Sequence, residues 1–435
     1  MAEMKSGLRP PAAVLKIART LEDAGHETWC VGGAVRDALL GLQHLDWDLA
    51  TAARPRQIRS LFQRTVPIGI EFGTVGVLDA ADVMHEVTTF RRDVHTDGRH
   101  AVVDFGVSLE EDLARRDYTI NAIAFSPATG EVRDPFGGRD DLARGVVRAV
   151  GEPHERMRED RLRALRAIRF AARFGFVIDG ETWEAILASS PHLTRLSAER
   201  VKQEIEKTLE QVRLPGTAFM MWKESGSLRV LIPALADISA LQLSALDHLS
   251  LPAMRNAQRR KVARLTVLFS AAAPGAVANV MRGLRFSNSD AAWISTVIAR
   301  WAALAAEMKM AMMSDEAPAD AALRRWAAIA GRTRLASVLR LADAHWWAER
   351  QAGLAAPTGA RIASVYRRAI LIAFRDPIEV GDLAVNGRDL ERLGITGPQT
   401  GQILRSLLET VINDPASNSP AVLLELARLR ASGSS

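Results

Sequence analysis

The sequence predicts an α+β protein, in which a mixed N-terminal part of strands and helices is followed by an all-helical remainder. Over the first 150 residues, short apolar runs typical of strands alternate with amphipathic segments of helical period. Beyond about residue 152, apolar residues recur at helical spacing and strand signals are few. At 435 residues the chain also exceeds what one core usually organises, so two or more domains are expected.

The first elements follow one another closely. After an opening helix, the pattern predicts a strand, a glycine turn, a helix and a second strand, at residues 27–31, 32–33, 34–41 and 45–51. Gly41 is the expected end of the helix, because glycine adopts the left-handed conformation that closes many helices.

The next segments continue the mixed pattern. A helix with proline in its first turn and two strands are predicted at residues 55–64, 74–79 and 84–90. Residues 91–105 have no clean period and carry charge around an Asp-Gly turn, so they predict a mobile loop. Residues 108–117 begin with Ser-x-x-Glu, the capping box that opens a helix.

Composition favours an ordinary globular protein. The chain is 48% hydrophobic and 25% charged, and it has no long uncharged apolar run of the kind that spans a membrane. The first residues lack the features of a secretory signal, so a cytoplasmic location is expected. The only cysteine, Cys30, lies in a predicted strand and is expected to be a buried, inert thiol.

The charge pattern is compatible with a polyanionic partner. The net charge of +5 is a mild excess. Arginines gather in residues 156–174, and arginine suits planar recognition of phosphates or base edges.

Two aspartates one residue apart are the first candidate site. In a strand, alternate side chains point to opposite faces, so Asp46 and Asp48 share one face while Leu45, Trp47 and Leu49 share the other. Neighbouring carboxylates repel each other unless a cation lies between them, and oxygen ligands at an open edge favour Mg²⁺. A solvated Asp-x-Asp on an edge strand is the alternative.

A glycine turn strengthens the metal interpretation. Gly32 and Gly33 follow a strand and open a helix, where backbone N–H groups can hold a triphosphate, and Arg36 lies in the first turn of that helix. The Asp-x-Asp strand comes thirteen residues after the turn, so the phosphate-binding turn and the carboxylate pair belong to adjacent elements. Glu86 is a possible third carboxylate, although a structural salt bridge explains it equally well.

Seven motifs in order resemble bacterial-type (class II) tRNA nucleotidyltransferases, the CCA-adding enzymes, and the similar poly(A) polymerases. The resemblance is close over about the first 230 residues and returns at VNGRDLERLGITGPQTGQIL. The motifs are VGGAVRDALLG, LDWDLAT, FGTVGV, TTFRRDVHTDGRH, DLARRDYTINAIAF, DPFGGRDDLARGVVRAVG and REDRLRALRAIRFAARFGF.

The resemblance implies a domain order. A head with a DNA polymerase β-like mixed sheet would be followed by a helical neck with a base-contacting helix, a helical body and a tRNA-binding tail. The expected ranges are 1–152, 153–232, 233–310 and 311–435. Within the last two, residues 307–322 predict a linker rich in methionine.

The resemblance also implies site residues. Asp46 and Asp48 would be catalytic and hold the metals, and Asp160 and Arg163 would contact the base of the incoming nucleotide. The resemblance implies five further nucleotide-binding residues, which are Gly33, Arg36, Arg116, Arg166 and Arg169. Arg166 and Arg169 would lie on the same helix as Arg163.

A carboxylate beside a guanidinium can select between nucleotide bases. Cytosine and adenine both present an amine beside an unprotonated ring nitrogen, whereas guanine and uracil present a carbonyl beside an N–H. At steps of three residues, Asp160, Arg163, Arg166 and Arg169 would form one stripe on a helix. An isolated i,i+3 salt bridge on a solvated helix is the alternative.

Three further features are ambiguous. Arg91, Asp93, Asp97, Gly98 and Arg99 lie in what resembles the flexible loop of the family, but the family's aromatic residue before DGRH is absent. Asp117 and Asn121 can equally be local structure. Glycines at residues 394–401 suggest either a contact with tRNA phosphates or a simple helix turn.

The implied function is template-independent addition or repair of the CCA 3′ terminus of tRNA, using CTP and ATP with Mg²⁺ and releasing pyrophosphate. The expected partners are the tRNA acceptor end, ATP and CTP, with no membrane and no DNA. The alternatives are a poly(A) polymerase, a variant that adds only CC or only A, and a non-catalytic RNA-binding protein. The segment PIGIEFGTVGV lacks the arginine-rich run usual in poly(A) polymerases, which favours the tRNA enzyme.

Overall fold

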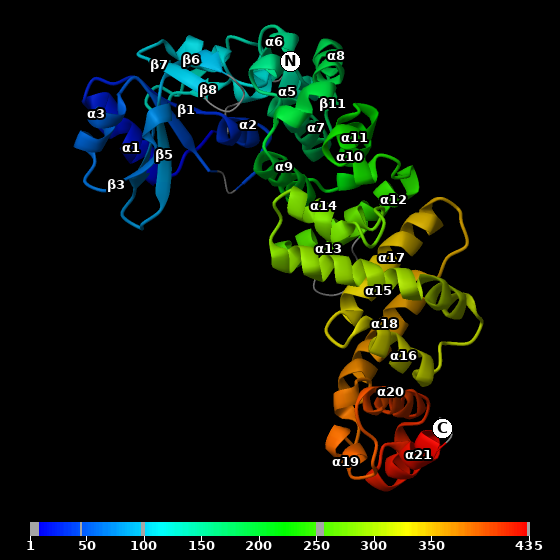
Figure 1. Ribbon diagram of the computed structural model, residues 1–435. Helices are drawn as coiled ribbons and strands as arrows, with labels where there is room; N and C mark the ends of the chain where they lie inside the picture. The colour runs from blue at the N-terminus through cyan, green and yellow to red at the C-terminus, as the bar shows by residue number, and fades with distance from the viewer. Residues whose placement is uncertain (1–7, 44–45, 97–100, 249–255, 433–435) are drawn as a thin grey trace. The chain divides into compact units, whose positions relative to one another are not determined.

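The computed structural model describes residues 8–43, 46–96, 101–248 and 256–432 (Figure 1). They form two compact units. The first consists of Met1–Leu214 and Ala218–Pro233, and the second of Pro215–Thr217 and Ala234–Ser435. All described strands belong to the first unit, so the predicted α+β class is confirmed. The division into four domains stays a prediction.

The first unit begins with the mixed part of the chain. Its helices are α1 (Ala12–Asp23), α2 (Gly33–Leu39), α3 (Pro55–Leu61), α4 (Leu109–Ala114) and α5 (Gly138–Arg144), with 3-10 turns η1 (Ile70–Phe72) and η2 (Thr119–Asn121). Its strands are β1 (Thr28–Val31), β2 (Asp48–Thr51), β3 (Thr65–Gly69), β4 (Thr74–Leu78), β5 (Met84–Thr89), β6 (Arg91–Thr96), β7 (Ala101–Phe105), β8 (Ala124–Phe125), β9 (Val132–Arg133) and β10 (Val146–Val147).

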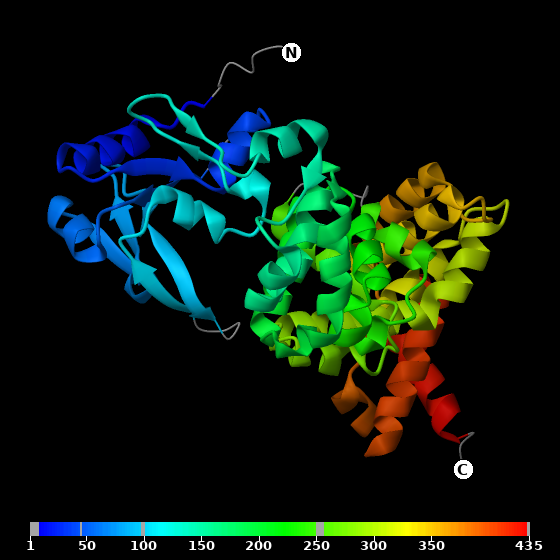
Figure 2. The ribbon, with the colours of Figure 1, turned by 90° about the horizontal axis from the view of Figure 1, so that it is seen from above.

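Seven strands form one mixed sheet in the order β3-β4-β5-β2-β1-β8-β9 (Figure 2). Strands β2 and β5 are parallel, and the other neighbours are antiparallel. One core cluster joins Trp29, Val31 and Ala50 of the two central strands to Leu109 and Leu113 of α4. Burying this apolar face fixes the register of the strands, because a slip of one residue would expose it.

The second strand confirms the predicted alternation but begins later than expected. Trp47 and Leu49 are buried, whereas Asp48 is half-buried and Asp46 is exposed. Strand β2 starts at Asp48, and Leu45 lies outside the described residues. Cys30, opposite Leu49 in the ladder, is buried, and burial raises the pKa of its thiol to about 12. The thiol is therefore inert, as predicted.

The loop predicted at residues 91–105 is wrong. Strands β6 and β7 pair there as an antiparallel hairpin. Arg92 and Asp104 face each other across it at 2.9 Å, and both side chains are about half exposed. A hairpin with charged residues on an exposed face has no apolar alternation, so its sequence gave no strand signal. Asp97, Gly98 and Arg99 lie outside the described residues, and the described Asp93 belongs to β6.

The rest of the first unit is helical apart from one short strand. Its elements are α6 (Pro153–Glu159), α7 (Leu162–Phe174), β11 (Val177–Ile178), α8 (Gly180–Ser189), η3 (Ser190–Arg195), α9 (Ala198–Gln211), α10 (Pro215–Glu224) and α11 (Ser227–Leu231), with the first residues of α10 counted in the second unit. Strand β11 pairs with β10 in parallel, so the expected all-helical remainder is wrong at this point. Each of these strands has only two residues, which are too few to show the alternation of apolar and polar residues typical of a strand.

The second unit is helical throughout its described residues. Its elements are η4 (Pro233–Leu235), α12 (Ala240–Ser244), η5 (Ala245–Asp247), α13 (Ala257–Phe269), α14 (Val277–Gly283), α15 (Asn288–Met313), α16 (Asp320–Ala330), α17 (Leu335–Gln351), α18 (Gly359–Arg375), η6 (Val380–Asp382), α19 (Gly387–Glu391), α20 (Pro398–Asn413), η7 (Pro415–Ser417) and α21 (Pro420–Ser432). Among the described residues of the chain, no helix has both the length and the apolar character needed to cross a membrane.

The linker predicted at residues 307–322 is much shorter than expected. Helix α15 continues to Met313 and α16 begins at Asp320. Met308 and Met312 of this segment are buried, so these methionines fill the core instead of marking a loop.

A histidine in the second unit predicts acid sensitivity. His345 of α17 stacks on Trp301, and its Nε2 lies 3.0 Å from Oγ of Ser270. Burial lowers the pKa of His345 to about 4 from 6.5, although Glu349 acts in the opposite direction. Between these values the unfolded chain binds a proton that the folded chain excludes. The free energy of unfolding should therefore fall by about 3 kcal/mol as the pH drops from about 6.5 to 4.

Urea unfolding of the wild type and of His345→Asn across this pH range checks the expectation. The variant has no titrating ring, so its stability should decline less steeply than that of the wild type. Parallel declines in the two proteins would contradict it.

Candidate active site

A cavity of about 990 Å³ lies within the first unit. Its lining comes from the β1–α2 turn, β2, β5, the end of α4, η2, α7 and α9. Seven of the nine residues that the sequence singled out line it. They are Gly33, Arg36, Asp46, Asp48, Arg116, Arg166 and Arg169.

Three carboxylates stand at one side of this cavity. Leu49 of β2 is paired with Val87 of the parallel strand β5, so the preceding residues, Asp48 and Glu86, project from the same face of adjacent strands. Asp46 lies just before β2 and lines the same cavity. The suggested third carboxylate, Glu86, is thus placed beside the predicted pair.

The carboxylates interact strongly with one another. Burial raises the pKa of Asp48 to about 7, and the negative charges of Glu86 and Asp46 add to the effect, while Arg116 opposes it. A cation bound between the carboxylates would relieve this repulsion. Among the described residues, no group of three or more His, Cys, Asp and Glu side chains is arranged to hold a metal ion. The donor set that fits a hard divalent cation is therefore the aspartate pair with additional oxygen ligands from water or substrate.

The glycine turn brings backbone close to the carboxylates. Gly32 has φ 75°, a conformation that disfavours other residues. A Cβ atom there would lie 3.1 Å from Nη1 of Arg116 and 3.9 Å from Oδ2 of Asp48. The positive φ is therefore what favours glycine here, while a side chain would also press on the Arg116 guanidinium and make an ordinary contact with the carboxylate.

Arg116 is positioned from α4. Its Nη2 donates to Asp112 at 3.1 Å, and Arg115 donates to the other oxygen of the same carboxylate. Asp112 is buried; desolvation alone would raise its pKa, but Arg116 and Arg115 lower it. In the described part of the chain, Nε of Arg116 is buried and has no hydrogen-bond partner. This nitrogen is closed off from solvent, so contact with a ligand would fall to the terminal nitrogens of Arg116, whose side chain lines the cavity.

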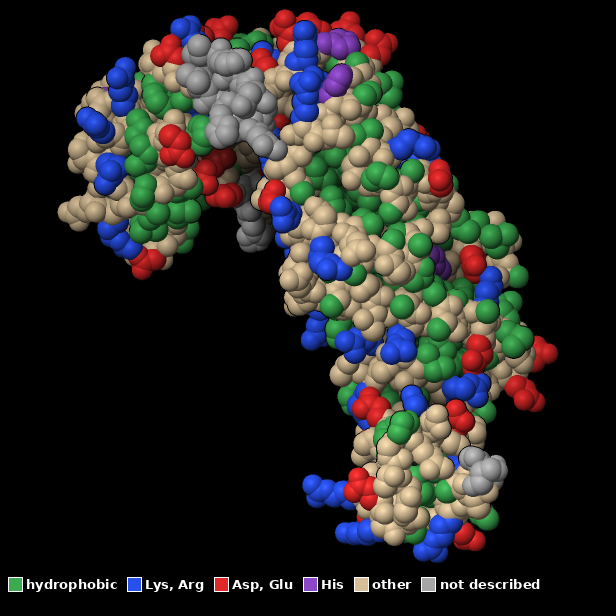
Figure 3. Space-filling view, in the orientation of Figure 1, with side chains coloured by type: hydrophobic (Ala, Val, Ile, Leu, Met, Phe, Trp, Pro, Cys, Tyr) green, Lys and Arg blue, Asp and Glu red, His purple; other side chains and the backbone are tan. Residues whose placement is uncertain are grey.

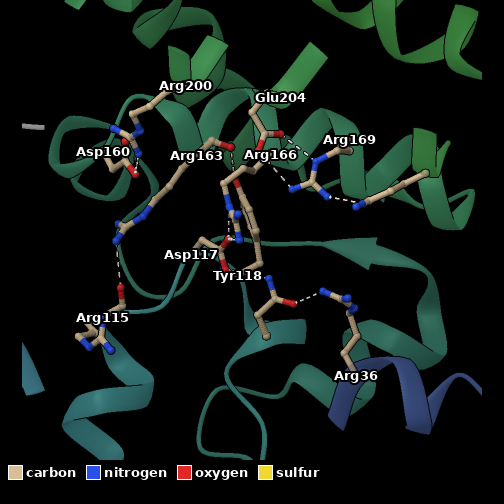
Figure 4. Close-up of polar contacts among 12 residues, drawn as sticks. Arg36, Arg115, Asp117, Tyr118, Asp160, Arg163, Arg166, Arg169, Arg200 and Glu204 are labelled. Atoms are coloured by element: carbon tan, nitrogen blue, oxygen red, sulfur yellow. Dashed lines mark hydrogen bonds and ion pairs between the residues drawn. The ribbon is translucent and has the colours of Figure 1, made fainter. Parts of the chain in front are cut away.

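A chain of polar contacts joins α2 to α7 (Figure 4). Nη1 of Arg36 donates to Oδ1 of Asn121 at 2.5 Å, and Nδ2 of Asn121 donates to Asp117 at 2.8 Å. Asp117 in turn accepts from Nε of Arg166 at 2.8 Å. Asp117 and Asn121 also line the cavity, so the network that they form belongs to its wall.

Asp117 keeps its negative charge although most of its side chain is buried. Desolvation would raise its pKa, but Arg166 and the amide of Asn121 lower it to about 2. Asp117 in turn raises the pKa of Arg166. The pair is therefore ionised at neutral pH, and it holds the guanidinium of Arg166 at the cavity wall.

Arg36 has a second partner of its own. It lies 2.7 Å from Asp37, whose other oxygen accepts from Arg173 of α7 at 2.9 Å. The Arg36 guanidinium also lies 4.9 Å from the ring centres of Phe170 and Phe174. Burial lowers the pKa of Arg36, and Asp37 counteracts this effect. Arg36 is therefore held rigidly, with a buried side chain that shapes the cavity floor.

Arg169 is engaged by α9. Its Nε donates to Oε2 of Glu204 at 2.8 Å and its Nη1 to Gln211 at 3.1 Å, as Figure 4 shows for the carboxylate. Both charged side chains are almost inaccessible, at 4% and 2% exposure. This buried ion pair fixes α9 against α7.

Asp160 and Arg163 do not line the cavity in the described structure, and the predicted single stripe is wrong. Asp160 has φ −146° and ψ 106°, so it ends α6 instead of lying on α7. Its carboxylate accepts from Arg200 at 2.7 Å, as Figure 4 shows. Arg163 donates to Glu159 at 2.6 Å. Asp160 caps the new helix by accepting from the backbone N–H of Leu162.

Several residues of the site were not singled out from the sequence. Asp37, Asp112, Arg173 and Glu204 each position a predicted residue or form part of its network. The Arg36-Asp37 dipeptide was a usable signal. The partners of Arg173 and Arg169 are 136 and 35 residues away along the chain, so no spacing could indicate them.

Two family comparisons match separate parts of the chain. Residues 28–148 match the family described as the poly A polymerase head domain. Residues 175–239 match the family described as the probable RNA and SrmB-binding site of polymerase A.

Individual proteins extend the similarity to the whole chain. A CCA-adding enzyme of Lactiplantibacillus plantarum is 34% identical over 424 residues, which are 96% of either chain. The CCA-adding enzyme of Bacillus subtilis is 48% identical over 198 residues, or 45% of this chain and 49% of that protein. The crystal structure of the Bacillus stearothermophilus CCA-adding enzyme in complex with CTP has a TM-score of 0.75 and 32% identity, covering 98% of this chain and 100% of that one.

Proposed function

Because the chain belongs to the CCA-adding enzyme family, we propose that it builds or repairs the CCA 3′ terminus of tRNA with nucleotides from CTP and ATP. The observation that carries this proposal is the cavity in which Asp46 and Asp48 face the glycine turn and Arg116. Nucleotidyl transfer needs groups that position the reactants and neutralise charge, and no side-chain nucleophile is required. For such an enzyme we also infer a cytoplasmic location.

Asp46 and Asp48 would hold the divalent metal ions that enzymes of this family use, and Mg²⁺ is the ion we propose. When bound there, the metal supplies activation of the RNA 3′-hydroxyl and stabilisation of the departing pyrophosphate. Glu86 adds negative charge next to the pair and supports its affinity for a cation. Gly32 keeps backbone and Arg116 close to Asp48, so substrate phosphates would lie between opposite charges.

The triphosphate would be bound by backbone and arginines together. The N–H of Gly33 and the guanidinium of Arg116 are the direct contacts we propose, since both line the cavity beside Asp48. Arg36 and Arg166 face the same space, and Asp117 and Asn121 orient them. Because the acids of this network are already paired with the arginines, each arginine is held in one orientation before the nucleotide binds.

Asp160 and Arg163 are proposed to contact the nucleotide base, on the strength of their motif and chemistry. For this role Asp160 would exchange Arg200 for the amine of cytosine or adenine. Such an exchange conserves one charge-assisted hydrogen bond, and a carbonyl of guanine or uracil at the same place would leave the carboxylate unpaired. Base choice would therefore depend on this carboxylate.

Asp160→Ala is expected to weaken base choice more than triphosphate binding. Sites built on such hydrogen bonds discriminate by roughly 10⁴-fold, and we expect the variant to lose at least about 10²-fold of this preference. The measurement is kcat/KM for CTP and ATP against GTP and UTP. The exposed Asp140→Ala serves as a control of equal charge. A preserved preference would contradict the proposed contact.

The function itself is tested with tRNA transcripts that lack the terminus. Each labelled triphosphate is supplied alone and then in pairs. Incorporation of two C residues followed by one A is the expected result. Unlimited addition of A from ATP alone would identify a poly(A) polymerase instead, and addition of only C or only A would identify a partial activity.

A further inference from the structure

A second cavity in the first unit has positive or protonatable side chains at four of its eight lining residues. Its volume is about 320 Å³, and α6, α8, η3 and the start of α7 form its wall. Four of its lining residues are His154, Arg158, Arg161 and His192. It shares no lining residue with the catalytic cavity among the described residues. Figure 3 shows histidine and basic side chains over α6 and α8, with acidic side chains beside them.

The positive charges of this cavity have no acidic partner in its wall. No described Asp or Glu lines it. Nη1 of Arg161 donates to Oγ of the buried Ser189 at 3.1 Å, so this guanidinium is held by a neutral group. Burial lowers the pKa of Arg161, and the charges of Arg195 and Arg158 add to the effect. Positive charges that converge and repel one another favour a bound anion.

Glu152, an acid that interacts with two of the lining residues, is engaged at the start of a helix. Glu152 caps α6 by accepting from the backbone N–H groups of His154 and Glu155, at 3.2 and 2.7 Å. These hydrogen bonds lower the pKa of Glu152, and the one from the N–H of Glu155 has the largest effect. The positive charges of His154 and Arg158 lower it further. Glu152 therefore offsets part of the positive field at the start of α6, but it does not enter the cavity.

The geometry points to a phosphate group as the ligand. We propose that this cavity binds a phosphate, either of an RNA backbone or of free inorganic phosphate. A guanidinium presents a fork of donors that matches phosphate oxygens, and here two such forks come from α6 and the start of α7. Met157 and Ala185 are buried and give the cavity an apolar floor, which suits the carbon skeleton next to a phosphate ester.

The test removes two exposed charges around the cavity. Arg158→Gln/Arg195→Gln is compared with Arg139→Gln/Arg144→Gln, which removes the same charge from exposed positions of α5. All four side chains are exposed, so both proteins are expected to fold with unchanged melting temperatures. Binding of a tRNA transcript is measured against salt concentration, and binding of inorganic phosphate is measured by calorimetry.

Each source of phosphate gives its own result. If the ligand is an RNA backbone, the first variant should bind tRNA about 3- to 10-fold more weakly than the control, and its slope of log K against log salt should fall by about 1. If the ligand is free phosphate, tRNA binding should match the control, while the variant should bind one inorganic phosphate fewer. Equal behaviour of both variants in both measurements would overturn the proposal.

Discussion

Replacing both Asp46 and Asp48 with Asn is expected to lower nucleotide addition by at least about 10³-fold, because the amides cannot hold a divalent cation between them. Binding of tRNA should change little. Melting temperature should not fall, because burial and the neighbouring acids already disfavour a charge on Asp48 and the neutral amide removes that repulsion. The combination of lost turnover with retained stability distinguishes a metal-holding role from a structural one.

The measurement is incorporation of labelled CTP and ATP into tRNA transcripts at saturating Mg²⁺. Asp23→Asn/Asp140→Asn is the matched control, since it removes two exposed carboxylates of the same unit. The control should retain full activity. Normal turnover in the Asp46 and Asp48 variant would refute the metal site.

Glu204→Ala is expected to destabilise the first unit by about 3 to 5 kcal/mol, because it leaves the buried charge of Arg169 without its carboxylate. Gln211 retains a single hydrogen bond to the guanidinium and does not neutralise it. The guanidinium is also freed to move at the cavity wall, so a loss of activity should accompany the loss of stability.

The loss of stability is measured by urea unfolding, as the change in free energy of the transition in which the first unit unfolds. The double variant Arg169→Met/Glu204→Leu provides the control, because replacing a buried ion pair by apolar side chains of similar size often costs little. It should recover most of the stability that Glu204→Ala loses, but not the activity. A cost below about 1 kcal/mol for Glu204→Ala would show that the pair is not effectively buried.

The sequence was sufficient wherever a local pattern decides the structure. Trp47 and Leu49 are buried on the face opposite Asp48, as alternation predicts, and Ser108 accepts from the backbone N–H of Glu111 as the capping box requires. The aspartate pair and the glycine turn also meet in one cavity. In these cases the determining residues are neighbours along the chain, so their spacing carries the information.

The sequence was insufficient where distant partners decide. The helical period runs without Gly or Pro from residue 154 to 174, yet the helix breaks at Asp160. Aspartate is a common capping residue, and its bond to the N–H of Leu162 shows that this signal was present but ambiguous. The direction of a long side chain depends on which partner tertiary packing supplies, so the contacts of Asp160 with Arg200 and of Arg169 with Glu204 could not be predicted.

Two arginines on α7, seven residues apart, are anchored by acids from the N-terminal part of the chain: Arg166 by Asp117 and Arg173 by Asp37. Two parts of the cavity lining are thereby joined at two separate points. Any change in the shape of this cavity would therefore require both ion pairs to break, or α7 and the N-terminal elements to shift as one body.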